Sequence, residues 1–135
     1  MPMRTHLLVV ASRTAVSDEL VSYLSRRAAI TPLRVTLAVP LELGGREEAR
    51  ARLARGLDVL RAAGLDAGGV VAGDGDPLHA VLDVYDPRRH DEIVVVTLPE
   101  HLSRWLGCDL PQRIARVTGA LVHHVPAEVP APVRR

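Results

Sequence analysis

Two segments of strand length, HLLVVA at 6–11 and EIVVVT at 92–97, constrain the fold of this chain more than any other feature. Each is apolar at successive positions rather than at alternate ones. A strand of this kind has apolar side chains on both faces and must be covered on both, as in the interior of a parallel sheet. We therefore predict an α/β fold in which the strand at 6–11 is central.

The rest of the chain alternates between strand and helix patterns. Further strands are predicted at 33–39, 67–72 and 121–125. Helices are predicted from Val16 through Leu24, over 46–63, from Asp76 through Leu82, and over part of 99–118. In the second helix we expect Glu48 and Arg52 to pair on the outer side. This alternation predicts a five-stranded parallel sheet with helices on both faces.

Length and composition indicate one globular domain. The chain has 135 residues, 47% apolar and 24% charged, which is the balance of neither a disordered chain nor a membrane protein. Its longest apolar runs are of strand length, and its start lacks the layout of a secretory signal. Cys108 is the only cysteine, which fits a reducing compartment. We expect a cytoplasmic protein without membrane association, with a domain at 1–126 and a disordered tail at 127–135.

Residue usage narrows the chemistry. All 17 basic residues are arginine, which excludes a lysine Schiff base and a phosphate-binding P-loop lysine. No Gly-x-Ser-x-Gly sequence is present to place a hydrolase nucleophile. The 16 acidic residues leave a net charge of +1, which predicts no nucleic-acid binding. We therefore expect no catalytic residues and a non-enzymatic protein.

The stretch from 75 to 125 resembles the universal stress protein family, and the first strand and helix fit it as well. That family has Gly-x-Pro before a helix, Asp-x-Ile-Val at a strand, and a helix that runs into the last strand. The matching residues here are Gly75, Pro77, Asp91, Ile93, Val94 and the segment 120–125. The resemblance implies the strand order 3-2-1-4-5 in a Rossmann-like, adenine-nucleotide α-hydrolase-like three-layer sandwich. It also implies a homodimer and a role in the stress response or in regulation.

The same resemblance implies an ATP site where strands 1 and 4 end, at the switch point of this strand order. ATP-binding members have an aspartate after strand 1 and a Gly-x2-Gly-x9-Gly-Ser/Thr loop after strand 4. The matching positions hold Ser12, Val96, Pro99, Asp109 and Leu110. These residues add bulk, remove a backbone donor and set a negative charge against phosphate. We predict a divergent member that lacks the ATP-binding glycine loop, has no cofactor and does not bind ATP.

A second interpretation keeps a small-ligand site at the same strand ends. The segment Ser12-Arg13-Thr14 is similar to the hydroxyl-rich phosphate loop of flavodoxins, although the glycine of that loop is missing. Together with Thr97, it could hold a modified nucleotide or another anion at the start of a helix. The simpler explanation is that Thr14 or Ser17 caps that helix.

The remaining polar clusters favour structural roles. Gly73-Asp74-Gly75-Asp76 begins like a dinucleotide fingerprint, but its two aspartates would repel a pyrophosphate, so a tight turn with a helix cap is favoured. Neighbouring residues of a strand point to opposite faces, so His123 and His124 cannot bind one metal ion together. His101 and Cys108 have no recognised ligand spacing, and we predict no metal site.

The last strand is predicted to form a dimer interface. In the family's order it is an edge of the sheet, and an apolar edge strand invites pairing with a second copy. We expect an antiparallel two-fold pair built from Leu121, Val122, His123, His124 and Val125. Trp105 alternatively marks a surface for an unidentified protein partner. The sequence thus predicts a regulatory protein that acts through dimerisation or partner binding.

Overall fold

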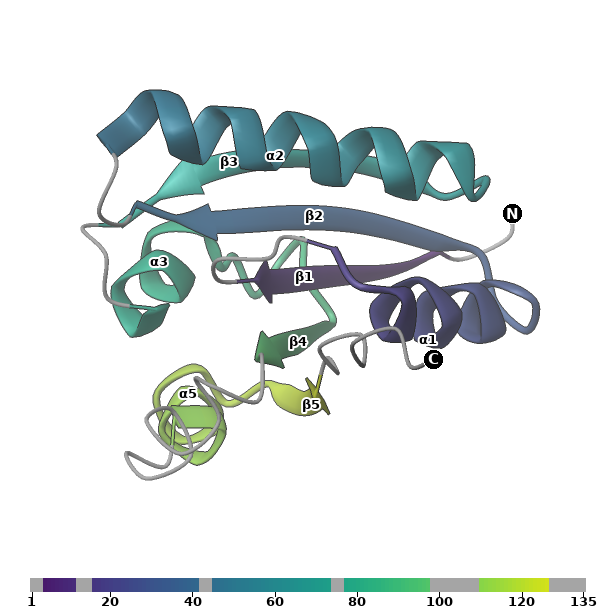
Figure 1. Ribbon diagram of the computed structural model, residues 1–135. Coiled ribbons are helices and arrows are strands. Elements are labelled where there is room, and N and C mark those ends of the chain that lie inside the picture. Colours follow the sequence, from purple (N-terminus) through teal and green to yellow (C-terminus); the bar gives the residue numbers. More distant parts are fainter. Residues whose placement is uncertain (1–3, 12–15, 42–44, 74–76, 98–109, 127–135) are drawn as a thin grey trace, which may run out of the picture.

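Five strands form one parallel sheet at the centre of the structure, a computed structural model that describes residues 4–11, 16–41, 45–73, 77–97 and 110–126. The strands are β1 (Thr5–Ala11), β2 (Leu33–Pro40), β3 (Asp66–Ala72), β4 (Glu92–Thr97) and β5 (Leu121–Pro126). Their order is β3-β2-β1-β4-β5, and every neighbouring pair is parallel (Figure 1). The predicted sheet, its strand order and the central place of the first strand are confirmed.

Helices cover both faces of this sheet and complete the three predicted layers (Figure 1). They are α1 (Asp18–Ala28), α2 (Gly45–Ala62), α3 (Pro77–Val84) and α5 (Leu110–Thr118). The first two pack on one side, the α1/α2 face, and the other two pack on the opposite side, the α3/α5 face. No helix in the described part of the chain is long and apolar enough to cross a bilayer.

Strand β1 shows why its sequence is apolar at successive positions. Leu7 and Val9 point into the core of the α1/α2 face, and Leu8 and Val10 point into the core of the α3/α5 face. All four side chains are fully buried. The alternation of a strand thus fills two separate cores from one segment.

The helix ends follow local chemistry. Ser17 caps α1, because its Oγ accepts a hydrogen bond of 3.1 Å from the backbone N–H of Leu20. This confirms the simpler explanation for that hydroxyl. Gly64 follows the end of α2 with a φ of +86°, and its N–H donates to the carbonyl of Arg61 at 3.0 Å.

The prediction that Arg52 lies on the outer side of α2 is wrong. Its side chain is only 10% exposed, and its Nε lies 3.7 Å from Oε1 of Glu48. Arg52 shares the buried face of α2 with Ala49 and Leu60. An arginine has a long aliphatic stem that packs like an apolar side chain, so its charge alone does not place it in solvent.

Candidate functional site

The predicted ligand site lies where β1 and β4 end side by side. Ala11 ends β1 next to Val96 of β4, and Thr97 ends β4 at the carboxyl edge of the sheet. The rest of that prediction falls outside the described residues. Also outside them lie Ser12, Arg13, Thr14, Asp74, Gly75, Asp76, Pro99, His101, Trp105, Cys108 and Asp109, and the tail at 127–135.

Val96 is the described residue that bears most directly on nucleotide binding at these strand ends. It occupies the first glycine position of the family's ATP loop, but here it continues β4 in register with Ala11. Its side chain is 2% exposed and belongs to the core of the α1/α2 face. A glycine at such a position leaves room for backbone to approach a phosphate, and a valine fills that room with core.

The second candidate is the β5 edge, which pairs with β4 on one side only. Leu121 at its start is 59% exposed, and Val122, His123 and His124 are half-buried. Val125 is 8% exposed and packs in the core of the α1/α2 face, so its side chain cannot be offered to a partner. The first four of the five predicted interface residues therefore have side-chain surface available.

An ionic network anchors this edge on the α1/α2 face. The guanidinium of Arg27 donates to both carboxylate oxygens of Glu92, from NH1 at 2.6 Å and from NH2 at 2.9 Å. Nε2 of His123 lies 2.7 Å from Oε1 of the same carboxylate. Arg27 also donates to the hydroxyl of Tyr23 at 3.2 Å. One glutamate at the start of β4 thus ties the last turn of α1 to β5.

The charges in this network support one another. Hydrogen bonds from Arg27 and then from His123 hold the pKa of Glu92 below its ordinary value, against the opposing effect of burial. The hydrogen bond to Glu92 in turn raises the pKa of Arg27. Bidentate pairs between arginine and a carboxylate are strong and directional. The network therefore fixes the ring of His123.

The sequence analysis missed Arg27 and Glu92. They are 65 positions apart in the chain, and neither belongs to a motif. The available signal was the glutamate that opens an otherwise apolar strand, because a charge next to a core needs a partner. The identity of that partner depends on the packing of α1, which the sequence alone does not give.

His124 lies on the other side of β5 from His123, as predicted. Strand alternation places it with Val122, which packs on the α3/α5 face. Burial lowers the pKa of His124. Within the described residues, no three His, Cys, Asp or Glu side chains gather as ligands for a metal ion.

Two solved structures are similar to this chain. The crystal structure of a universal stress protein in complex with cAMP covers 91% of this chain and 98% of its own, with a TM-score of 0.57 and 23% identity. The structure of the universal stress protein from Archaeoglobus fulgidus in complex with dAMP covers 88% and 97%, with a TM-score of 0.55 and 17% identity. No family model matches the sequence, and no curated protein matches it.

At this level of identity the likeness establishes the fold. The chain has the three-layer fold of universal stress proteins over nearly its whole length. This agrees with the strand order that the resemblance implied.

Proposed function

We propose that this chain, which has the fold of universal stress proteins, is a non-enzymatic protein of the stress response or of regulation that acts as a two-fold homodimer. The observation that carries the proposal is β5, an edge strand with the exposed side chain of Leu121 at its start. Unpaired backbone groups on such an edge are satisfied by a second copy of the same strand. Because the single Cys108 fits a reducing compartment, we place the protein in the cytoplasm.

The opposite edge, β3, is less suited to pairing. Its first residue, Asp66, is charged and forms ion pairs with Arg4 and Arg34. Glycines at 68 and 69 leave the middle of β3 without side chains. Charges and glycines are features that keep edge strands from pairing. In contrast, β5 presents Leu121 and Val122 together, followed by two histidines.

The dimer can be tested with one substitution on each edge. Leu121→Arg puts a charged side chain in place of an apolar one at each end of the antiparallel β5 pair, and charged side chains keep edge strands from pairing, so sedimentation at about 10 µM should show a monomer where the wild type is a dimer. Val70→Arg is the matched control, because Val70 is an exposed aliphatic residue of the other edge strand, β3. It should leave the dimer intact.

Three results would contradict the proposal. The first is a wild type that sediments as a monomer. The second is a dimer that Val70→Arg dissociates and Leu121→Arg does not. The third is a Leu121→Arg variant that remains dimeric. The second result would move the interface to β3. Circular dichroism of each variant checks that the fold is kept.

We also propose that the usual ATP site is absent. The buried side chain of Val96 supports this, because it stands where ATP-binding relatives have a glycine. The loss of several charge-assisted hydrogen bonds should leave no measurable binding of ATP, ADP or AMP at about 100 µM by calorimetry. The alternative is a remodelled site for a nucleotide or another anion at the loops after β1 and β4. A micromolar dissociation constant that is lost in Arg13→Ala would establish that alternative.

A further inference from the structure

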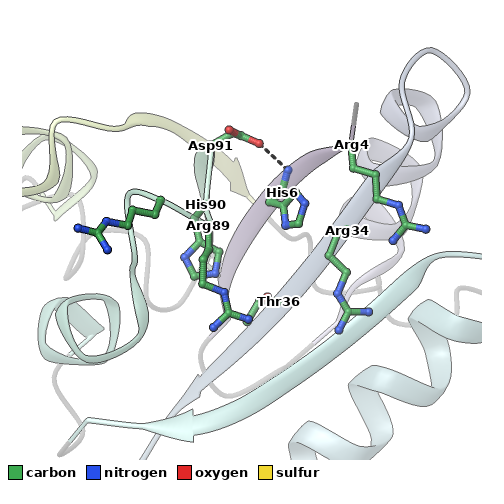
Figure 2. A pocket seen from close by; sticks show the side chains of 8 residues that line it. Arg4, His6, Arg34, Thr36, Arg89, His90 and Asp91 are labelled. Atoms are coloured by element: carbon green, nitrogen blue, oxygen red, sulfur yellow. Dashed lines mark hydrogen bonds between the residues drawn. The ribbon is translucent and has the colours of Figure 1, made fainter. Parts of the chain in front are cut away.

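A polar hollow opens on the α3/α5 face, at the amino ends of the strands and thus opposite to the end where β1 and β4 finish (Figure 2). Its volume is about 330 Å³. We call it the amino-end hollow. Its basic lining consists of Arg4, Arg34, Arg88, Arg89, His6 and His90.

The hollow exists because the side chains on this face change from apolar to polar along the strands. Leu8 of β1 and Ala38 of β2 pack in the core of the α3/α5 face. On the same face, His6 lies two residues before Leu8. Thr36 and Arg34 lie two and four residues before Ala38. The helix α3 ends at Val84, and the segment that returns to β4 carries arginines rather than apolar residues.

That segment, 85–91, is a built turn. Oδ1 of Asp86 accepts a hydrogen bond from the N–H of Arg88 at 2.9 Å. The backbone carbonyl of Asp86 accepts a second one from the N–H of His90 at 2.8 Å. Nδ1 of His90 accepts in turn from the N–H of Asp86 at 3.0 Å. The ring of His90 is buried and stacks on Tyr85 with centroids 6.0 Å apart. The arginines of the turn are therefore held in place by a fixed backbone.

The turn is also fastened to β1 by Asp91. Its Oδ2 accepts from the N–H of His6 at 2.8 Å, and its own N–H donates to the carbonyl of His6 at 2.7 Å. Figure 2 shows this joint at the rim of the hollow, with Arg89 reaching toward Thr36 and with Arg34 and Arg4 on the far side. The carboxylate of Asp91 is thus engaged with the backbone.

The hollow carries an excess of positive charge. Asp66 pairs with both Arg4 and Arg34, which leaves one net charge from that group. Within the described parts of the chain, Arg88 and Arg89 form no ion pair. The four arginines therefore exceed the three carboxylates of Asp66, Asp86 and Asp91 by one charge. Burial and then the charge of Arg89 lower the pKa of His90, against the opposing effect of Asp86 and Asp91.

We infer that the amino-end hollow binds a small phosphorylated molecule. Guanidinium groups bind phosphate oxygens in a bidentate manner, and each has five N–H donors, so Arg4 and Arg34 keep donors beyond those given to Asp66. The hydroxyl of Thr36 and the ring of His6 add hydrogen-bond partners on the floor formed by the sheet. Such a site is distinct from the strand ends where the similar proteins are expected to hold nucleotides.

Size and charge favour a small ligand over a nucleic acid. The volume lies at the lower end of the range of small-molecule pockets. The net charge of the whole chain is only +1, so the molecule as a whole has little attraction for a polyanion such as a nucleic acid. Gly68 also serves the site, because a Cβ there would lie 3.0 Å from NH2 of Arg34. The glycine thus gives the guanidinium space across the neighbouring strand.

Pyrophosphate is the probe for this proposal. Calorimetric titration of the full chain at about 0.15 M salt keeps weak surface attraction screened. We expect saturable binding to one site with a dissociation constant below about 1 mM. Arg89→Gln should weaken it about tenfold or more, because a charge-assisted contact is lost. Arg50→Gln, an exposed position on α2 across the sheet, should change nothing.

Each other outcome overturns the inference. Heat that does not saturate by about 10 mM would show that no site exists. Equal weakening in Arg89→Gln and Arg50→Gln would reduce the effect to net charge. Loss in Arg13→Ala with retention in Arg89→Gln would place the anion at the carboxyl end. If citrate binds as tightly as pyrophosphate, the hollow has no preference for phosphate. If a short single-stranded oligonucleotide binds more tightly than pyrophosphate, the ligand is a nucleic acid and not a small molecule.

Discussion

At the scale of single residues, the absence of one Cβ atom sets how closely β3 packs. A Cβ built on Gly69 would lie 2.6 Å from Cδ1 of Leu53 on α2 and would also overlap the carbonyl oxygen of Leu37. The neighbouring Gly68 would meet only the end of the flexible side chain of Arg34. Two adjacent glycines of the same strand thus meet different constraints.

Gly69→Ala is therefore expected to destabilise the protein by about 1–3 kcal/mol, as overpacking of a core does. Gly68→Ala is the matched control and should stay within about 1 kcal/mol of the wild type, because an alanine also reduces the entropy of the unfolded chain. Urea unfolding of both variants measures the difference. Equal stability of the two would show that α2 can shift to accept the methyl group.

Residue-level features were the hardest to predict from the sequence. The cap at Ser17 could be read locally, because capping involves neighbouring residues. The burial of Arg52 could not be predicted in this way. The long side chain of an arginine can lie on the outer or the buried side of a helix, and the packing of the helix decides which. The same holds for the pair of Arg27 and Glu92, whose contact depends on tertiary structure.

At the scale of elements, one carboxylate joins α1, β4 and β5. The side chain of Glu92 is 17% exposed and accepts from Arg27 on the helix and contacts His123 on the edge strand. Glu92→Gln removes the charge while nearly preserving the shape. We expect this substitution to lower the free energy of unfolding by about 1–3 kcal/mol at neutral pH, as the removal of hydrogen bonds to a charged group does.

The control is Arg55→Met, which removes a pair on the surface of α2. Arg55 is 66% exposed, and its NH2 lies 3.8 Å from Glu48. This change should cost less than about 0.5 kcal/mol, because solvent screens such pairs. If both variants lose the same free energy of unfolding, the network does not anchor β5.

The contribution of Glu92 also has a defined dependence on pH. Its pKa in the folded state is lowered, first by the hydrogen bond from Arg27. The stabilisation is then full above the unfolded pKa of about 4.3 and is lost as the pH falls through the lower folded pKa. The difference in stability between wild type and Glu92→Gln should therefore shrink toward acidic pH. A difference that stays constant from neutral to strongly acidic pH would contradict this origin.

The elements themselves were largely predictable. The strands were found because a central parallel strand needs apolar residues on both faces, and that requirement is visible along the sequence. The amino-end hollow was missed, although its signal was present. Arg34 and Thr36 interrupt β2 on one face only, and a polar row within a covered strand indicates that the cover is incomplete.

At the scale of the whole molecule, the sheet offers three separate surfaces. The carboxyl end between β1 and β4 is where this fold places ligands, the amino end carries the arginine-lined hollow, and β5 is an open edge. The fold and its open edge followed from strand order, and the resemblance supplied that order. What each surface binds depends on side chains that the order does not specify.

The proposed dimer should respond to acid through His124. A two-fold axis near the middle of an antiparallel β5 pair brings the rings of His123 and His124 close to the partner strand. Nε2 of His123 is engaged with Glu92, 2.7 Å away. Burial already lowers the pKa of His124. Pairing buries it further, so the dimer binds a proton on this ring less readily than the monomer does.

The dissociation constant should therefore rise as the pH falls below about 6.5, since protons are taken up when the dimer separates. Sedimentation at a series of pH values between about 7.5 and 5.5 measures this dependence in the range where histidine titrates. His124→Gln should flatten the curve, whereas His79→Gln on α3, an exposed position away from β5, should leave it unchanged. A dissociation constant that does not vary with pH in the wild type would show that His124 is not at the interface. An equal response in His124→Gln and the wild type would assign the proton to another group.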